Sequence, residues 1–259
     1  MEKYIHRLSF VLTFVLFYGF ATDMYLSYKG FVYQNGTFEL VKKANAFVWD
    51  ENVPVSEETS FATPIDANIA LNLPTQNVAG SQKAPITIYE FSSLGCSHCA
   101  DFHLNILPKL TKDYFDADKV KLVFVDFPLD KKSMQASMLA HCLNQFDRAD
   151  FLRFVFSKQR EWGWARSAES YLIAYAKEYG LSAEKAEMCL KNDAIAKEIL
   201  FNRQEAIDKL HIDGTPAFLV SDINRNEMIY GVLNLDDLKA YLDDRLAALM
   251  PEKEEMVDD

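Results

Sequence analysis

Residues 86–99 read ITIYEFSSLGCSHC, and this stretch decides how the chain folds. Its first half is a short run of β-forming residues, which predicts a buried strand. Its second half contains Cys96 and Cys99, and a predicted helix runs from Cys96 to about Tyr114 with three-to-four-residue apolar spacing. A cysteine pair at the point where a strand passes into a helix predicts a redox-active disulfide.

The position of Cys96 at a helix N-terminus explains that chemistry. Unpaired backbone amides and the helix dipole stabilise a thiolate there, and a thiolate is the species that attacks disulfides. His98 can add a hydrogen bond or a positive charge, while Cys99, one turn deeper, is expected to resolve the mixed disulfide. A zinc site completed by His98 or His103 and an inert disulfide are the alternatives.

The rest of the chain predicts an α/β fold. A second buried strand at 121–125 completes a β-α-β unit, so the sheet is at least partly parallel. A helical block follows from about 131 to 210, then strands at 217–220 and 228–230. A final helix closes the fold at about 235–249.

Two further features point to the same site. Gly214-Thr215-Pro216 reads as a turn before a strand, and a cis bond at Pro216 would leave the Thr215 backbone able to pair with an extended substrate. Glu90 lies at the end of the first strand, where a buried carboxyl could take and return the proton of the resolving thiol. An ordinary turn and a surface acid are the alternatives.

The chain has four cysteines, and the other two are Cys142 and Cys189. They lie on different predicted helices of the middle block, so we expect a structural disulfide between them. Paired free thiols in the core and a second redox relay are the alternatives.

The N-terminal region differs from the rest. Residues 1–21 have a basic start followed by an apolar run, which predicts a signal peptide or, through residues 4–21, a membrane anchor. Residues 22–83 predict a loosely structured extension with a short hairpin around Asn35-Gly36; a helical stalk for oligomerisation is the alternative. Residues 250–259 predict an acidic disordered tail.

The composition of the chain argues against one class of function. The formal net charge is −11, which argues against a nucleic-acid-binding protein because phosphate recognition needs a basic face. Hydrophobic residues make up 49 % of the chain, enough for a full core.

Over residues 84–249 the sequence resembles the DsbA-like thiol:disulfide oxidoreductases of the thioredoxin superfamily. The resemblance is carried by residues 90–99 (EFSSLGCSHC), Phe102-His103 and residues 214–217 (GTPA). It implies a thioredoxin-like fold, in which a central mixed sheet is flanked by helices and carries an inserted all-helical domain. It also implies a nucleophile at Cys96, a resolving thiol at Cys99, a buried acid at Glu90 and a cis-proline at Pro216. It further matches members with an extra cysteine pair in the inserted helices.

The function expected from this resemblance is disulfide formation in exported proteins of the bacterial periplasm or cell envelope. Its partners would be unfolded or folding proteins that bear cysteines and a membrane-embedded, quinone-linked reoxidase; no cofactor, metal or nucleic acid is expected. Ser97 departs from the proline that many members have there, so the oxidising strength stays open. An isomerase or reductase of the same fold is one alternative, and a non-catalytic envelope chaperone or binding module is the other.

Overall fold

The structure is a computed structural model that describes residues 31–34, 37–40, 61–66, 73–74 and 79–249. The chain divides into two compact units, Met1–Thr59 and Ser60–Asp259, which are described separately. The predicted signal peptide or anchor at 1–21 and the predicted tail at 250–259 lie outside the described residues. Within the described part of the chain, no helix is long and apolar enough to cross a membrane.

In the first unit, the described residues form an antiparallel pair of strands. β1 (Phe31–Gln34) pairs with β2 (Thr37–Leu40), so that Phe31 lies opposite Leu40. The sequence predicts a hairpin here, although its expected turn residues, Asn35 and Gly36, are themselves outside the described part.

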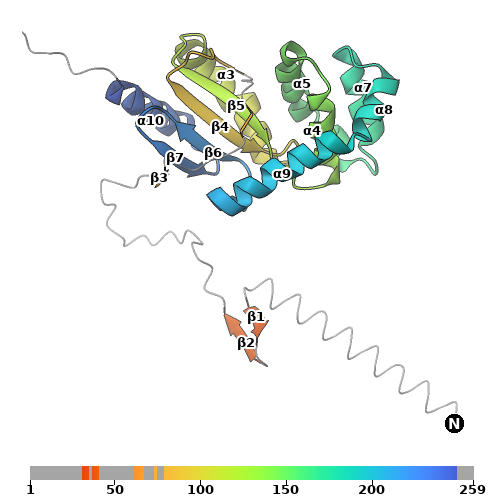
Figure 1. The fold of residues 1–259 in the computed structure, drawn as a ribbon, viewed down its shortest axis with the longest axis horizontal. Coiled ribbons are helices and arrows are strands. Elements are labelled where there is room, and N and C mark those ends of the chain that lie inside the picture. The colour runs from red at the N-terminus through yellow and green to blue at the C-terminus, as the bar shows by residue number, and fades with distance from the viewer. Residues whose placement is uncertain (1–30, 35–36, 41–60, 67–72, 75–78, 250–259) are drawn as a thin grey trace, which may run out of the picture. The chain divides into compact units, whose positions relative to one another are not determined.

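The second unit is built on a mixed five-stranded sheet in the order β3-β7-β6-β4-β5 (Figure 1). β4 and β5 are parallel, as the β-α-β pattern predicts, and the other neighbours are antiparallel. The strands are β3 (Ala62–Ile65), β4 (Ile86–Ser92), β5 (Val120–Asp126), β6 (Ala217–Ser221) and β7 (Asn226–Tyr230).

The edge strand β3 corrects the predicted domain boundary. Residues 62–65 fall in the segment 22–83 that was expected to be a loosely structured extension, yet they pair with β7, with Ala62 opposite Ile229. Pro64 lies within this strand, and an edge strand tolerates proline because one side of it carries no ladder. The folded unit therefore begins before residue 84.

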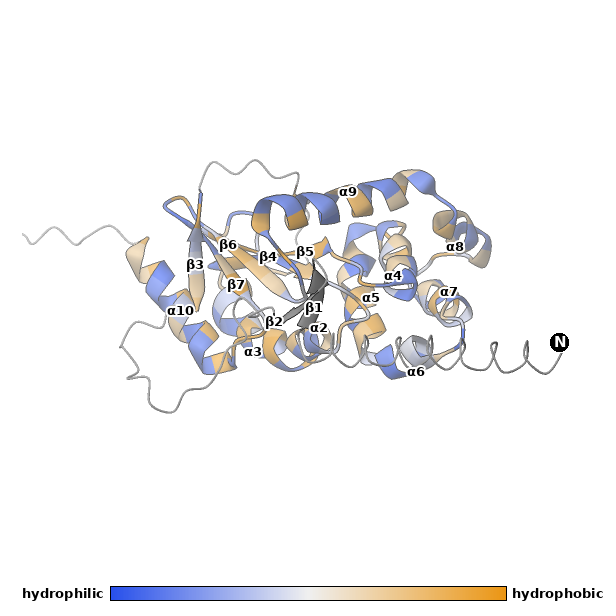
Figure 2. Cartoon of the chain, turned by 90° about the horizontal axis from the view of Figure 1, so that it is seen from below, coloured by the Kyte–Doolittle hydropathy of each residue, from blue (hydrophilic) through white to orange (hydrophobic). Residues whose placement is uncertain are grey.

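Helices cover both faces of the sheet and form a separate block beside it (Figures 1 and 2). The long first helix and the C-terminal helix pack on one face, where Ile86 and Ile88 meet Phe102, Ile106 and Leu238. The end of α9 (Asp193–Leu210) packs on the other face through buried core residues. The remaining helices, together with most of α9, form the block: α4 (Lys131–His141), α5 (Gln145–Ser157), α6 (Gln159–Trp164), α7 (Glu169–Glu178) and α8 (Ala183–Leu190). The C-terminal helix on the sheet is α10 (Leu235–Ala248).

The first helix is irregular. It passes from α2 (Ser97–Asp101) through a π-helical turn η1 (Phe102–Ile106) and α3 (Leu107–Leu110) to a second π-helical turn η2 (Thr111–Phe115). Pro108 lacks the amide hydrogen that a regular α-helix needs at this point, which accounts for a departure from regular helix near it. The first π-helical turn carries His103 into the interior.

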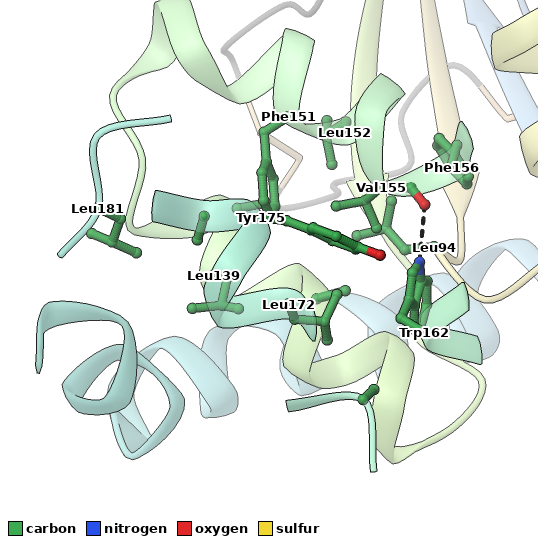
Figure 3. Packing of buried hydrophobic residues seen from close by; sticks show 14 of the residues in the cluster. Leu94, Leu139, Phe151, Leu152, Val155, Phe156, Trp162, Leu172, Tyr175 and Leu181 are labelled. Carbon is green, nitrogen blue, oxygen red and sulfur yellow. Dashed lines mark hydrogen bonds between the residues drawn. The ribbon is translucent and has the colours of Figure 1, made fainter. Parts of the chain in front are cut away.

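The helical block has its own core of buried apolar side chains (Figure 3), and this cluster extends to the cysteine motif. Leu94 and Cys99 belong to the same buried cluster as Phe151, Val155 and Phe156 of α5. Trp162 is fully buried there, and its indole Nε1 donates to the Val155 carbonyl at 2.9 Å. The inserted helices therefore pack directly against the cysteine pair.

A buried ionic network fixes the C-terminal helix to the sheet. The Arg245 guanidinium is fully buried, donates to Asp222, and reaches Glu227 Oε2 at 2.8 Å and the Tyr241 hydroxyl at 2.7 Å. Buried charges are tolerated only when they are paired and hydrogen-bonded, as they are here.

Candidate active site

Cys96 is the N-cap of the first helix. Its backbone is extended (φ −82°, ψ 125°), and its Sγ accepts the backbone N–H of Cys99 at 3.4 Å. Cys96 is partly exposed and Cys99 is fully buried, and both are free thiols. The structure thus places one accessible sulfur at the helix start and a second one turn deeper.

The Thr215–Pro216 loop lies against Cys96. The peptide bond between Thr215 and Pro216 is cis, and the Cys96 thiol donates to the Thr215 carbonyl at 3.3 Å. β6 begins only at Ala217, so Thr215 precedes the paired part of the strand. The predicted site residues Cys96, Thr215 and Pro216 are therefore brought together from two distant parts of the chain.

The two thiols have opposite acidities. The pKa of Cys96 is lowered to about 5, first by a hydrogen bond from the Cys99 thiol and then, against partial burial, by the Thr215 side chain and the backbone amides of Cys99 and His98. Burial raises the pKa of Cys99 well above its usual range, and hydrogen bonding to Cys96 and the charge of Glu90 raise it further. At neutral pH, Cys96 is a thiolate and Cys99 a thiol.

His98 is placed differently from the sequence-based expectation. Its side chain is exposed and makes no hydrogen bond with the described residues, whereas its backbone N–H helps to stabilise the Cys96 thiolate. At position 98 it is therefore the backbone N–H, and not a charged imidazole, that lowers the pKa of Cys96.

Glu90 is fully buried within β4, where it alternates onto the same face as Ile86 and Ile88. That face is covered by the first helix, and His103 Nε2 lies 2.7 Å from Glu90 Oε2. The surface-acid alternative for Glu90 is therefore wrong. The partnership with His103 was not predicted, although His103 follows Cys99 by four residues and so shares its helix face.

Cys142 and Cys189 form a disulfide across 47 residues of the helical block. The neighbouring His141 lies 2.7 Å from Asp126, which also receives Arg148 at 3.2 Å. Sequence reasoning missed this cluster, because it joins the end of β5 to two helices of the inserted block.

A surface cavity of about 510 Å³ adjoins the motif. Gly95, Ser97 and Trp164 are among the residues that line it, and Trp164 is 87 % exposed. Gln159 fixes the nearby backbone by donating to the carbonyls of Leu94 and Cys96 at 2.6 and 2.8 Å.

The alternative zinc site has no complete ligand set in the described part of the chain. No group of three or more His, Cys, Asp or Glu side chains there is arranged to hold a metal ion. His103, one of the two histidines that could complete such a site with Cys96 and Cys99, is instead paired with Glu90.

Comparison with known proteins places this geometry in a family. A family model described as Thioredoxin matches residues 72–244. The crystal structure of Wolbachia pipientis alpha-DsbA1 is 30 % identical, with a TM-score of 0.62, and the match covers 69 % of this chain and 94 % of that one. The crystal structure of oxidised BdbD from Bacillus subtilis, at 23 % identity and a TM-score of 0.57, shows the fold alone; the match covers 69 % of this chain and all of that one.

Two curated relatives are similar in sequence. A Rickettsia typhi protein named as a protein-disulfide oxidoreductase is 27 % identical over 179 residues, which is 68 % of this chain. The match spans 64 % of the length of that relative. Disulfide bond formation protein D of Bacillus subtilis is 26 % identical over 176 residues, covering 66 % of this chain and 77 % of that protein.

Proposed function

Because the chain belongs to the thioredoxin family, in its DsbA-like branch, we propose that it is a thiol–disulfide oxidoreductase that forms disulfides in exported proteins. The observation that carries the proposal is the Cys96 sulfur at a helix start, stabilised as a thiolate and lying 3.3 Å from the Thr215 carbonyl of the cis-proline loop. The names of the curated relatives point to the same activity.

In the proposed reaction, a substrate thiolate attacks Cys96 Sγ of the oxidised Cys96–Cys99 pair. The bond between the two protein sulfurs breaks, a mixed disulfide forms, and Cys99 leaves and takes up a proton. A second substrate thiolate then displaces Cys96, so the substrate loses two electrons and the protein gains them. Cys96 leaves readily because it is stable as a thiolate.

The same acidity supports the oxidising direction of the reaction. A thiolate with a pKa of about 5 stabilises the reduced form of the protein and so makes its disulfide a stronger oxidant. The loop at Thr215 and Pro216 would hold the substrate, since the Thr215 backbone lies outside the strand pairing and beside Cys96. Glu90 would take and return the proton of Cys99, whose pKa its charge raises.

The proposal also includes the substrates, the cellular location and the partner of the protein. Its substrates would be unfolded or folding proteins with cysteines, in the bacterial periplasm or cell envelope. A membrane-embedded, quinone-linked partner would reoxidise the reduced protein, and residues 1–21 would form a signal peptide or, through residues 4–21, a membrane anchor.

The test is the equilibrium of the Cys96–Cys99 pair with glutathione, combined with refolding of reduced and of scrambled ribonuclease. We expect an oxidising potential and faster reactivation of the reduced substrate, with both assays lost in Cys96→Ser. A reducing potential with better rescue of the scrambled substrate would support an isomerase or reductase instead. Full cellular function of Cys96→Ser would support a binding module.

A further inference from the structure

We propose that His103 is the proton exit of the redox site, passing to water in a surface cavity the proton that Glu90 takes from Cys99. The inference rests on the proposed function, because it concerns the step in which Cys99 becomes a nucleophile. His103 acts through Glu90 and does not touch the substrate, so it is a positioning and proton-relaying residue.

The need for an exit comes from the burial of Cys99. This thiol must lose its proton to displace a partner from Cys96, yet it is fully buried and its pKa is raised by burial. The carboxyl of Glu90 is near enough for its charge to act on Cys99, but Glu90 is also fully buried. Neither group can pass the proton directly to bulk water.

The hydrogen bonding of Glu90 identifies His103 as the next group in the relay. Glu90 Oε2 lies 2.7 Å from His103 Nε2, while Oε1 has no hydrogen-bond partner among the described residues. The unpartnered Oε1 is free to accept the proton of the thiol. Cys99 and His103 are four residues apart on one helix, so both face the carboxyl from the same side.

The imidazole is held firmly between aromatic rings. It stacks on Phe156 with ring centroids 4.5 Å apart and meets Phe102 and Phe124 edge-on. Among the hydrogen bonds of the described residues, the ring uses Nε2 alone, which leaves Nδ1 available for another partner.

A surface cavity of about 400 Å³ supplies that partner. His103 lines it together with Leu107 and Thr111 of the first helix and Leu152 and Arg153 of α5. A cavity of this size holds water, which Arg153, Thr111 and Asp116 at its wall can bind. Within the described part of the chain, His103 is therefore the one side chain that both hydrogen-bonds to Glu90 and borders this cavity.

The charged groups that face the ring are few. Glu90 faces it from β4, Arg153 shares its cavity from α5, and Asp116 shares it from the end of η2. Arg153 is itself paired with Asp150 at 3.2 Å. The carboxylate of Glu90 is the only one of these groups in direct contact with the imidazole.

The steps move protons alone. In the starting state, one proton is shared by Glu90 Oε2 and His103 Nε2, which lie 2.7 Å apart, and a second proton is on Nδ1. Cys99 gives its proton to Glu90 Oε1 and becomes a thiolate, the shared proton stays on His103 Nε2, and Nδ1 releases its proton to water in the cavity. No electron is transferred, and the reverse sequence protonates Cys99 when it leaves during substrate oxidation.

The test uses the reduced protein and dithiobis-nitrobenzoate, which releases thionitrobenzoate in two phases. Attack by Cys96 gives the first phase and resolution by Cys99 the second, and both are followed from pH 5 to pH 9 by stopped flow. The variants are His103→Gln, which keeps a hydrogen bond to Glu90, and His103→Ala. Asn105→Ala, at an exposed position of the same π-helical turn, is the matched control.

In His103→Gln, we expect the second phase to slow by about tenfold to a hundredfold near neutral pH and to recover at alkaline pH, where hydroxide can remove the proton. Added imidazole should restore the second phase of His103→Ala, since the vacated site adjoins the cavity. Asn105→Ala should match the unmodified chain.

An unchanged second phase in His103→Gln would overturn the relay, as would a slowed second phase in His103→Ala that imidazole does not restore. A first phase that titrates like an ordinary thiol in the unmodified chain would instead overturn the proposed function. The two phases therefore separate failure of the relay from failure of the proposed activity.

Discussion

The thiol of Cys96 lies 3.3 Å from the carbonyl oxygen of Thr215, although the two residues are 119 positions apart in the chain. The whole inserted helical block separates them in sequence, and the antiparallel pairing of β4 with β6 brings them together. The same loop brings the Thr215 side chain to Cys96 and lowers the pKa of its thiol, so the acidity of Cys96 depends in part on residues outside the cysteine motif.

Thr215→Val tests that dependence. The Thr215 hydroxyl is buried without a hydrogen-bond partner in the described part of the chain, and the Thr215 side chain lowers the pKa of Cys96. Its removal should raise the pKa of Cys96 above about 5 by roughly one unit, since a hydrogen bond to a charged group contributes about 1.5 kcal/mol or more. Thiolate absorbance at 240 nm against pH measures the shift, and Thr215→Ser should retain the original value.

The same acidity predicts how stability changes with pH. A thiol whose pKa falls from 9.0 in the unfolded chain to about 5 in the folded protein adds stability that is fully present above pH 9 and is lost as the pH falls towards 5. The oxidised protein has no Cys96 thiol, so the difference in unfolding free energy, reduced minus oxidised, should increase from pH 5 to pH 9. Urea unfolding of both forms measures it. A difference that stays flat over this range would show that Cys96 is not ionised in the folded state.

The second disulfide should stabilise the helical block without tuning the site. Replacing Cys142 and Cys189 together by Ala removes a link across 47 residues, which the chain-entropy model values at about 4 kcal/mol. We expect a lower midpoint of urea unfolding and an unchanged Cys96 titration. A changed Cys96 pKa in this variant would indicate coupling between the two cysteine pairs.

Arg245→Met tests the buried ionic network of the C-terminal helix. It leaves Asp222 and Glu227 without their buried partner, so we expect a loss of about 3–5 kcal/mol in unfolding free energy. Lys239→Met, on the same helix, removes only a partly exposed ion pair with Asp113 and should cost less than about 1 kcal/mol. Equal losses of unfolding free energy in Arg245→Met and Lys239→Met would show that the buried network contributes no more to stability than an exposed ion pair.

Much of the sheet could be predicted because several of its strands can be recognised from their own sequence. β4 and β5 are short apolar runs bounded by turn residues, and Pro216 stands just before β6. The edge strand β3 could not be predicted, since Pro64 and its polar surroundings resemble a linker, and its only strand-like property is its pairing with β7.

The candidate site divides in the same way. Cys96 and Cys99 are recognisable from their spacing and context, because the chemistry depends on one helix start. The contact between Glu90 and His103 depends on which strand the first helix covers, and the irregular π-helical turn sets the direction of the imidazole. The sequence likewise assigned the contribution of His98 to its side chain, whereas the backbone N–H supplies it.

The edge position of β3 has a practical consequence for anyone who shortens this protein. A chain that starts at residue 84 would keep every residue of the redox site but would leave the outer edge of β7 with open backbone donors and acceptors. Open strand edges pair with other molecules, so such a fragment should aggregate, whereas one that starts at residue 60 keeps its edge covered.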